Sequence, residues 1–88
     1  MRVLSALAQH NIKKAPDYQN WYNISNYYIL SEDFIREFQN YVYWNCICHN
    51  QKLSKEFIAE FADKINFNNM LTNDNISKEI KDYCRMFV

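Results

Sequence analysis

The chain repeats itself every 23 residues, and this period constrains the fold more than any other feature of the sequence. The segment from Trp21 reads WYNISNYYILSEDFIREFQNYVY, and the segment from Trp44 reads WNCICHNQKLSKEFIAEFADKIN. They align without a gap and are identical at eight positions: Trp21 and Trp44, Ile24 and Ile47, Leu30 and Leu53, Ser31 and Ser54, Phe34 and Phe57, Ile35 and Ile58, Glu37 and Glu60, Phe38 and Phe61. Similarity at a fixed period is typical of stacked helical units, none of which buries its apolar face alone.

A third unit from Phe67 keeps the pattern more loosely and reads FNNMLTNDNISKEIKDYCRMFV. We therefore predict a single domain over residues 1–88, with an N-terminal segment (1–20) and repeat units at 21–43, 44–66 and 67–88. A chain of 88 residues has room for only one hydrophobic core.

Each unit is predicted to be a short helix, a turn and a longer helix. Ser31 and Ser54 stand where an N-cap hydroxyl accepts a backbone N–H at the start of the second helix. The apolar residues that follow have amphipathic helical spacing, and Trp44 is expected to be a core anchor. They are Phe34, Ile35, Phe38 and Val42 in the first unit and Phe57, Ile58, Phe61 and Ile65 in the second.

Upstream, apolar residues from Val3 to Ile12 follow helical spacing as far as Pro16, which disfavours helix at the residue before it. The predicted fold class is therefore all-α, a small helical-repeat domain of short-helix and long-helix units stacked behind an N-terminal capping helix.

The chain contains no glycine, so we expect asparagine to fill left-handed turn positions, including Asn40, Asn68, Asn69, Asn73 and Asn75. Phosphate-binding loops of the P-loop or dinucleotide type need glycine for close backbone approach. The composition therefore argues against nucleotide enzymes, and no cofactor is expected.

The pattern W-x-x-I-S-x-x-Q-x-L-S-x-x-F-I-x-x-F resembles repeats in uncharacterised proteins of giant viruses, phages and some bacteria. The resemblance covers residues 21 to 66 well and 67 to 88 weakly, and this chain departs from it at Tyr28 and Cys48. It implies a viral or mobile-element origin and a protein partner in the host. It assigns no functional residue.

Charge and cysteine content limit which partners and which cellular compartment are expected. Ten Lys and Arg balance ten Asp and Glu, so nucleic acid is a disfavoured partner. No apolar run has the roughly 18 to 20 residues that span a bilayer, so no membrane segment is expected. Three cysteines are sparse and odd in number, which favours reduced thiols in the cytoplasm, that of the host if the chain is viral.

Metal binding and catalysis are both disfavoured. Cys46, Cys48, His49 and Cys84 are in principle four zinc ligands, but Cys46 aligns with Asn23, Cys48 aligns with Ser25, and the spacing does not match zinc motifs. Acidic pairs such as Glu32 with Asp33, and Glu37 with Glu60, are explained by helix starts and solvated faces. We predict no metal, no catalytic residue and no enzyme activity.

Five tyrosines of the first unit form the candidate partner-binding site: Tyr22, Tyr27, Tyr28, Tyr41 and Tyr43. Their counterparts in the second unit are Asn45, Asn50, Gln51, Lys64 and Asn66. A position that accepts a polar residue in one unit is expected to be exposed in the other, and exposed tyrosines are enriched at interfaces. The open alternative is that some of them pack against the N-terminal helix.

The sequence therefore predicts a non-catalytic protein-binding module. Its small size and the resemblance suggest a viral or phage inhibitor of a host defence system, such as an anti-CRISPR. The alternative is a nucleic-acid-binding module that uses a basic stripe on the last helix, formed by Lys78, Lys81 and Arg85.

Overall fold

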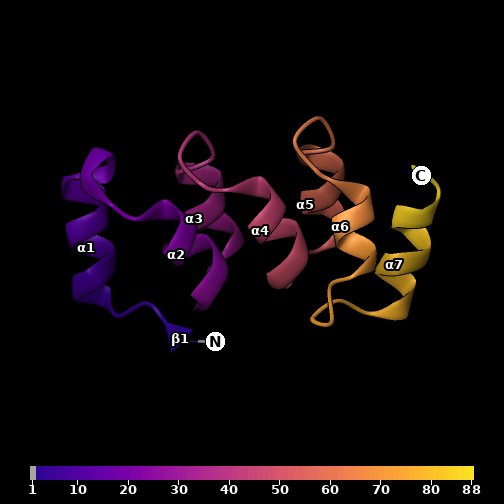
Figure 1. Ribbon diagram of the computed structural model, residues 1–88, viewed down its shortest axis with the longest axis horizontal. Helices are drawn as coiled ribbons and strands as arrows, with labels where there is room; N and C mark the ends of the chain where they lie inside the picture. Colours follow the sequence, from indigo (N-terminus) through magenta and orange to yellow (C-terminus); the bar gives the residue numbers. More distant parts are fainter. Residues whose placement is uncertain (1) are drawn as a thin grey trace. The chain divides into compact units, whose positions relative to one another are not determined.

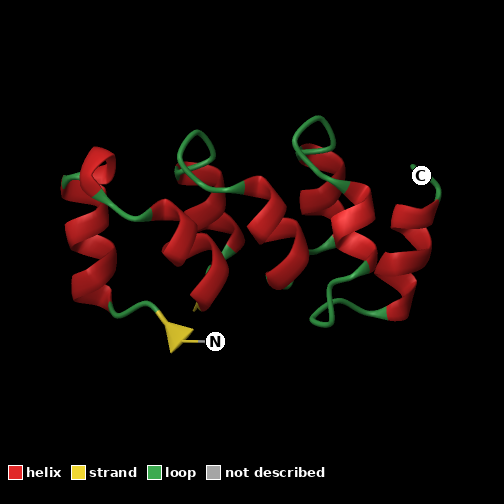
Figure 2. Ribbon diagram, viewed as in Figure 1, coloured by secondary structure: helices red, strands yellow, loops and turns green. Residues whose placement is uncertain are grey.

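Helices predominate in the structure, a computed structural model that describes residues 2–88 (Figures 1 and 2), so the mainly helical character is confirmed. The chain divides into two compact units, one ending at Tyr43 and the other starting at Trp44, and each is described by itself. The first contains β1 (Arg2–Val3), α1 (Ala6–Lys14), a 3-10 helix η1 (Pro16–Tyr18), α2 (Trp21–Tyr27), β2 (Tyr28–Ile29) and α3 (Glu32–Glu37). The second contains α4 (Trp44–Asn50), α5 (Lys55–Glu60), α6 (Phe67–Leu71) and α7 (Lys78–Arg85).

Serine side chains cap α1, α3, α5 and α7. The hydroxyls of Ser31 and Ser54 accept the backbone N–H of Phe34 and Phe57, each at 3.1 Å, as the sequence predicted. Ser5 and Ser77 cap α1 and α7 in the same way. Each cap provides a partner for one of the N–H groups that a helix start leaves unbonded.

In the repeat units 21–43 and 44–66 the second helix is shorter than the first, which is the reverse of the prediction, whereas in the unit 67–88 the second helix is the longer one as predicted. α3 ends at Glu37 and α5 at Glu60, so Val42 and Ile65 lie in the turns that follow, although both are buried. The carbonyl of Phe38 accepts N–H groups from the residues three and four positions later, which closes a tight turn in place of another helical turn. This turn keeps an apolar spacing close to that of a helix.

The all-α prediction missed one element. β1 and β2 pair in parallel, with Arg2 opposite Tyr28 and Val3 opposite Ile29. α1 therefore begins at Ala6, later than the apolar spacing indicated, and it ends before Pro16 as predicted. Each strand has only two residues and no detectable period, and the two are far apart in sequence, so local patterning could not reveal the pairing.

The prediction of left-handed asparagines is wrong, because no residue in the range 2–88 has a positive φ angle. Asparagine acts through its side chain. Asn20 and Asn66 cap α2 and α6 by accepting the N–H of Asn23 and Asn69. Asn73, which is fully buried, donates to two carbonyls near the end of α4.

Aromatic rings pack against one another within each compact unit. In the first, the ring of Trp21 lies 6.2 Å from that of Phe34 and 5.2 Å from that of Phe38. In the second, α6 packs against α4 and α7, and Trp44 lies 5.3 Å from Phe61. Trp21 is buried, whereas Trp44 is half-buried, and the Trp44 ring also lies 6.3 Å from that of the buried Phe57. The role of Trp44 as a core anchor stays a prediction.

None of the helices formed by residues 2–88 is both long enough and apolar enough to cross a membrane.

Candidate functional site

Three of the five tyrosines lie on the surface of the first unit. The exposed fractions of Tyr22, Tyr27 and Tyr43 are 48%, 55% and 53%. We call these three residues the tyrosine surface. Tyr22 and Tyr27 come from the two ends of α2, and Tyr43 ends the turn after α3.

Tyr22 and Tyr43 touch each other edge to face, with ring centroids 5.7 Å apart and an interplanar angle of 84°. The backbone N–H of Tyr43 donates to the buried hydroxyl of Ser25 at 3.0 Å, which holds the end of the turn against α2. Both rings are therefore placed by a helix and by a fixed backbone contact. An edge-to-face pair adds about 0.5–1.5 kcal/mol to the free energy of unfolding.

The equivalent positions of the second unit also touch, but they are polar. Asn66 Nδ2 donates to Asn45 Oδ1 at 3.4 Å, and the backbone N–H of Asn66 donates to Cys48 Sγ at 3.4 Å. Cys48 thus takes the acceptor role that Ser25 has 23 residues earlier. One backbone arrangement is compatible with a tyrosine pair in one unit and with an asparagine pair in the other.

Tyr41 is a packing residue. It is half-buried, and its ring lies 5.4 Å from Trp21 and 6.3 Å from Phe38. A hydrogen bond from its hydroxyl to Asp17, together with the negative charge of that carboxylate, raises the pKa of Tyr41. The aromatic ring at this position is therefore explained by contacts within the first unit.

Tyr28 is also half-buried, and the comparison that predicted its exposure fails. Its counterpart, Gln51, is only 1% exposed, so a polar residue at this position does not indicate a solvated site. Tyr28 lies opposite Arg2 in the β1–β2 pair.

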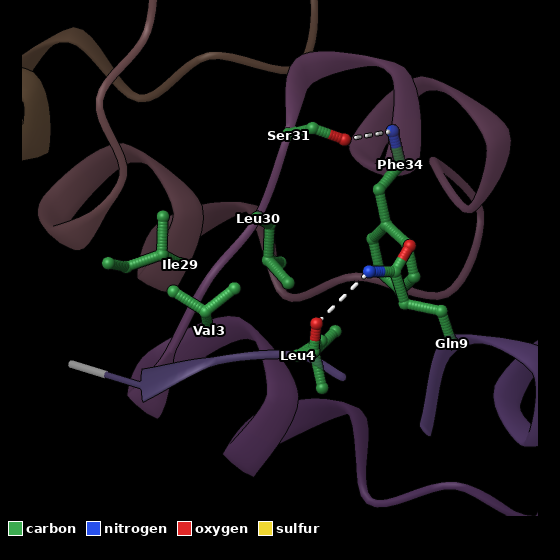
Figure 3. Close-up of a pocket in the computed structure, with 7 residues that line it drawn as sticks. All are labelled: Val3, Leu4, Gln9, Ile29, Leu30, Ser31 and Phe34. Atoms are coloured by element: carbon green, nitrogen blue, oxygen red, sulfur yellow. Dashed lines mark hydrogen bonds between the residues drawn. The ribbon is translucent and has the colours of Figure 1, made fainter. Parts of the chain in front are cut away.

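A pocket of about 430 Å³ lies beside the tyrosine surface and is lined by Arg2, Asn23, Tyr27 and Tyr28. A second pocket, of about 270 Å³, is lined in part by Val3 and Ile29 of the strand pair (Figure 3). Sequence reasoning missed Arg2, because only the pairing of β1 with β2 brings it to the tyrosines.

The three cysteines and His49 differ in their exposure to solvent. Cys48 and Cys84 are buried and Cys46 is half-buried, and burial raises the pKa of Cys48 to about 11. Nδ1 of the exposed His49 lies 2.7 Å from the hydroxyl oxygen of Thr72. Across residues 2–88, no three His, Cys, Asp or Glu side chains are grouped so that they could hold a metal ion.

The basic stripe on α7 is partly neutralised. Lys78 Nζ lies 3.6 Å from a carboxylate oxygen of Asp82, and Arg85 pairs with the other oxygen of the same carboxylate. The exposed charges of Lys78 and Arg85 therefore share one counter-charge, with Lys81 between them in the sequence. Nucleic-acid binding stays a prediction, and a steep loss of affinity with salt is its test.

Comparison with known proteins adds no relative: the chain matches no protein family, no curated protein and no solved structure. Function has to be inferred from the tyrosine surface and from the pockets beside the strand pair.

Proposed function

We propose that the chain is a non-catalytic module that binds another protein through the tyrosine surface. The observation that carries the proposal is the contrast between two equivalent contacts, the Tyr22–Tyr43 ring pair and the Asn45–Asn66 hydrogen bond. Because an asparagine pair suits the same positions, packing does not require aromatic rings in the first unit. Binding to a partner protein accounts for the aromatic rings at these two positions.

Tyrosine suits this role physically. It brings a large contact area with few rotatable bonds, so little side-chain entropy is lost when a partner covers it. The edge-to-face contact already restrains Tyr22 and Tyr43 in the free protein. Tyrosines that become fully buried in an interface often contribute about 2 kcal/mol or more to binding.

We propose further that the module is a helical-repeat array with units at 21–43, 44–66 and 67–88, stacked behind residues 1–20. In support, α2, α4 and α6 begin at Trp21, Trp44 and Phe67, which are 23 residues apart. Ser31, Ser54 and Ser77 cap the following helices at the same interval. Stacked units of this kind present an extended surface, which is how repeat proteins bind partners.

The biological role is proposed from the resemblance of the repeat. We propose that the partner is a host protein met in the cytoplasm, and that the chain acts by stoichiometric inhibition of a host defence system, as anti-CRISPR proteins do. Isolation of a partner from an extract of the natural host tests whether the partner is a host protein.

The test replaces both tyrosines by the residues of the second unit, in the double variant Tyr22→Asn/Tyr43→Asn. A partner is first isolated from an extract of the natural host, and its Kd is then measured for the wild type and for the variant. We expect a loss of affinity of about 30-fold, equivalent to about 2 kcal/mol, with a fall in melting temperature of only several degrees, because the exchange also removes the ring contact.

Tyr18→Ala is the matched control, because Tyr18 is 91% exposed and contacts no other ring among residues 2–88. This substitution removes an equally large aromatic side chain from the compact unit that ends at Tyr43, and it should leave Kd unchanged. An unchanged Kd for the double variant together with a large fall in melting temperature would show that Tyr22 and Tyr43 serve stability and that the interface lies elsewhere.

A further inference from the structure

The β1–β2 pair has two chemically different faces. Successive side chains of a strand point to opposite faces, and side chains of directly paired residues point to the same face. The register therefore places Arg2 and Tyr28 on one face and Val3 and Ile29 on the other. Figure 3 shows Val3 and Ile29 beside each other on the apolar face.

The polar face is rich in hydrogen-bond donors and has no acid. Its pocket is lined by Arg2, Asn23, Tyr27 and Tyr28, residue types whose side chains all carry hydrogen-bond donors and none of which is acidic. Arg2 is exposed and forms no ion pair within residues 2–88. A carboxylate from a partner complements this set, because arginine binds carboxylates with two parallel hydrogen bonds.

The apolar face has an opening for an aliphatic side chain. Its pocket is lined mainly by Val3, Leu4, Ile29, Leu30 and Phe34, and Val3 and Ile29 are 74% and 51% exposed. The polar groups at its edge already have partners (Figure 3). The side chain of Gln9 donates to the carbonyl of Leu4, and the hydroxyl of Ser31 accepts from Phe34.

The outer edge of β1 is unpaired within the first unit. Arg2 and Val3 pair with β2 on one side, and they make no other backbone hydrogen bond within residues 2–88. An unpaired strand edge is a template for an added strand, in which backbone bonds give affinity and alternate side chains give specificity.

We propose that this edge binds an extended peptide segment of the partner in which acidic and apolar side chains alternate. A carboxylate then enters the Arg2 pocket, and the next side chain covers Val3 on the opposite face. The proposal rests on the protein-binding function above and names the chemistry of the partner segment. Tyr27 is one of the three exposed tyrosines and also lines the Arg2 pocket.

The test uses labelled, end-blocked octapeptides and the full-length chain, with binding measured by fluorescence anisotropy at low salt. One peptide alternates valine with aspartate, one alternates valine with lysine, and a third is the aspartate peptide with N-methyl groups on alternate backbone nitrogens. We expect the aspartate peptide to bind about tenfold more tightly than the other two. Shifts of the Arg2 and Val3 amide resonances should accompany its binding.

Arg2→Glu should reverse the preference, so that the lysine peptide becomes the tighter ligand. Lys52→Glu is the matched control, because Lys52 is an exposed cation of the second unit and the substitution changes net charge equally. It should keep the preference for aspartate. Circular dichroism of both variants verifies that they remain folded.

Three results would overturn the proposal: equal binding of the acidic and basic peptides, equal effects of Arg2→Glu and Lys52→Glu, or undiminished binding of the N-methylated peptide. If the peptides fail while Tyr22→Asn/Tyr43→Asn still weakens the natural partner, strand addition is wrong and the proposed function stands. If the peptides bind as expected but the tyrosine variant has no effect on the partner, the strand edge is the interface and the tyrosine surface is not.

Discussion

Replacing Asn73 by alanine should strongly destabilise the compact unit that starts at Trp44. This side chain has no solvent exposure, and its Nδ2 donates to the carbonyls of Cys48 at 2.9 Å and Gln51 at 2.8 Å. Its Oδ1 accepts the backbone N–H of Asn75 at 2.7 Å. The two carbonyls lie near the C-terminal end of α4, where helix carbonyls have no partner within the helix.

The expected cost follows from these three hydrogen bonds. Each is worth about 1 kcal/mol net, and leaving a buried carbonyl without a partner costs about 1–3 kcal/mol more. Asn73→Ala should therefore lower the free energy of unfolding by about 4–6 kcal/mol. Domains commonly have only about 5–15 kcal/mol in total, so the variant should be close to unfolding.

Urea unfolding followed by circular dichroism measures this effect. Asn68→Ala is the matched control, because Asn68 is an exposed residue within α6 whose side chain forms no hydrogen bond to residues 2–88. The control should unfold at the wild-type midpoint or slightly above it, since alanine is the better helix former. Equal midpoints for Asn73→Ala and Asn68→Ala would refute the role assigned to the Asn73 amide.

Three further predictions concern stability. Ser31→Ala and Ser54→Ala should each cost about 1 kcal/mol in chemical denaturation through loss of an N-cap, and wild-type midpoints would contradict the caps. Trp21→Ala should lower the melting temperature more than Trp44→Ala, because Trp21 is buried and its indole N–H donates to the Pro16 carbonyl, and equal shifts would contradict this ranking. Burial raises the pKa of Cys48 from 9.0 to about 11, so the folded state keeps a proton that the unfolded chain loses above pH 9. Stability should then fall between pH 9 and 11 by about 2–3 kcal/mol, and Cys48→Ala should show a shallower fall.

Local sequence signals predicted the helix caps, whereas the sequence did not predict the long-range contacts. The caps of Ser31 and Ser54 depend on residues three positions apart, which a sequence pattern reveals directly. The strand pairing of Arg2 with Tyr28 and the bond from Asn73 to Cys48 join residues about 25 positions apart. Nothing in either segment identifies its partner, because the strands pair through backbone groups and the Asn73 amide donates to a backbone carbonyl, and every residue has such groups.

The predicted helix lengths failed for a different reason. Apolar residues at one-, four- and eight-residue spacing fit one face of a continuous helix, and they also fit a short helix followed by a tight turn. After Phe38 the chain forms the tight turn and not a continued helix, and Val42 is still buried. Hydrophobic periodicity reports which residues are buried, and the hydrogen bonds of the Phe38 carbonyl decide where the helix ends.

A polar residue in one repeat unit indicates an exposed position in the other unit only where the polar residue is itself exposed. Gln51 is buried, so its polarity says nothing about exposure at Tyr28, and the ring of Tyr41 is explained by Trp21 and Phe38. The Tyr22–Tyr43 pair is different, because its counterparts are themselves a contacting pair, one exposed and one half-buried. The second unit thus tests what this backbone arrangement requires, and it requires contact between the two side chains without requiring an aromatic ring. The proposed protein interface rests on two half-exposed rings at such positions.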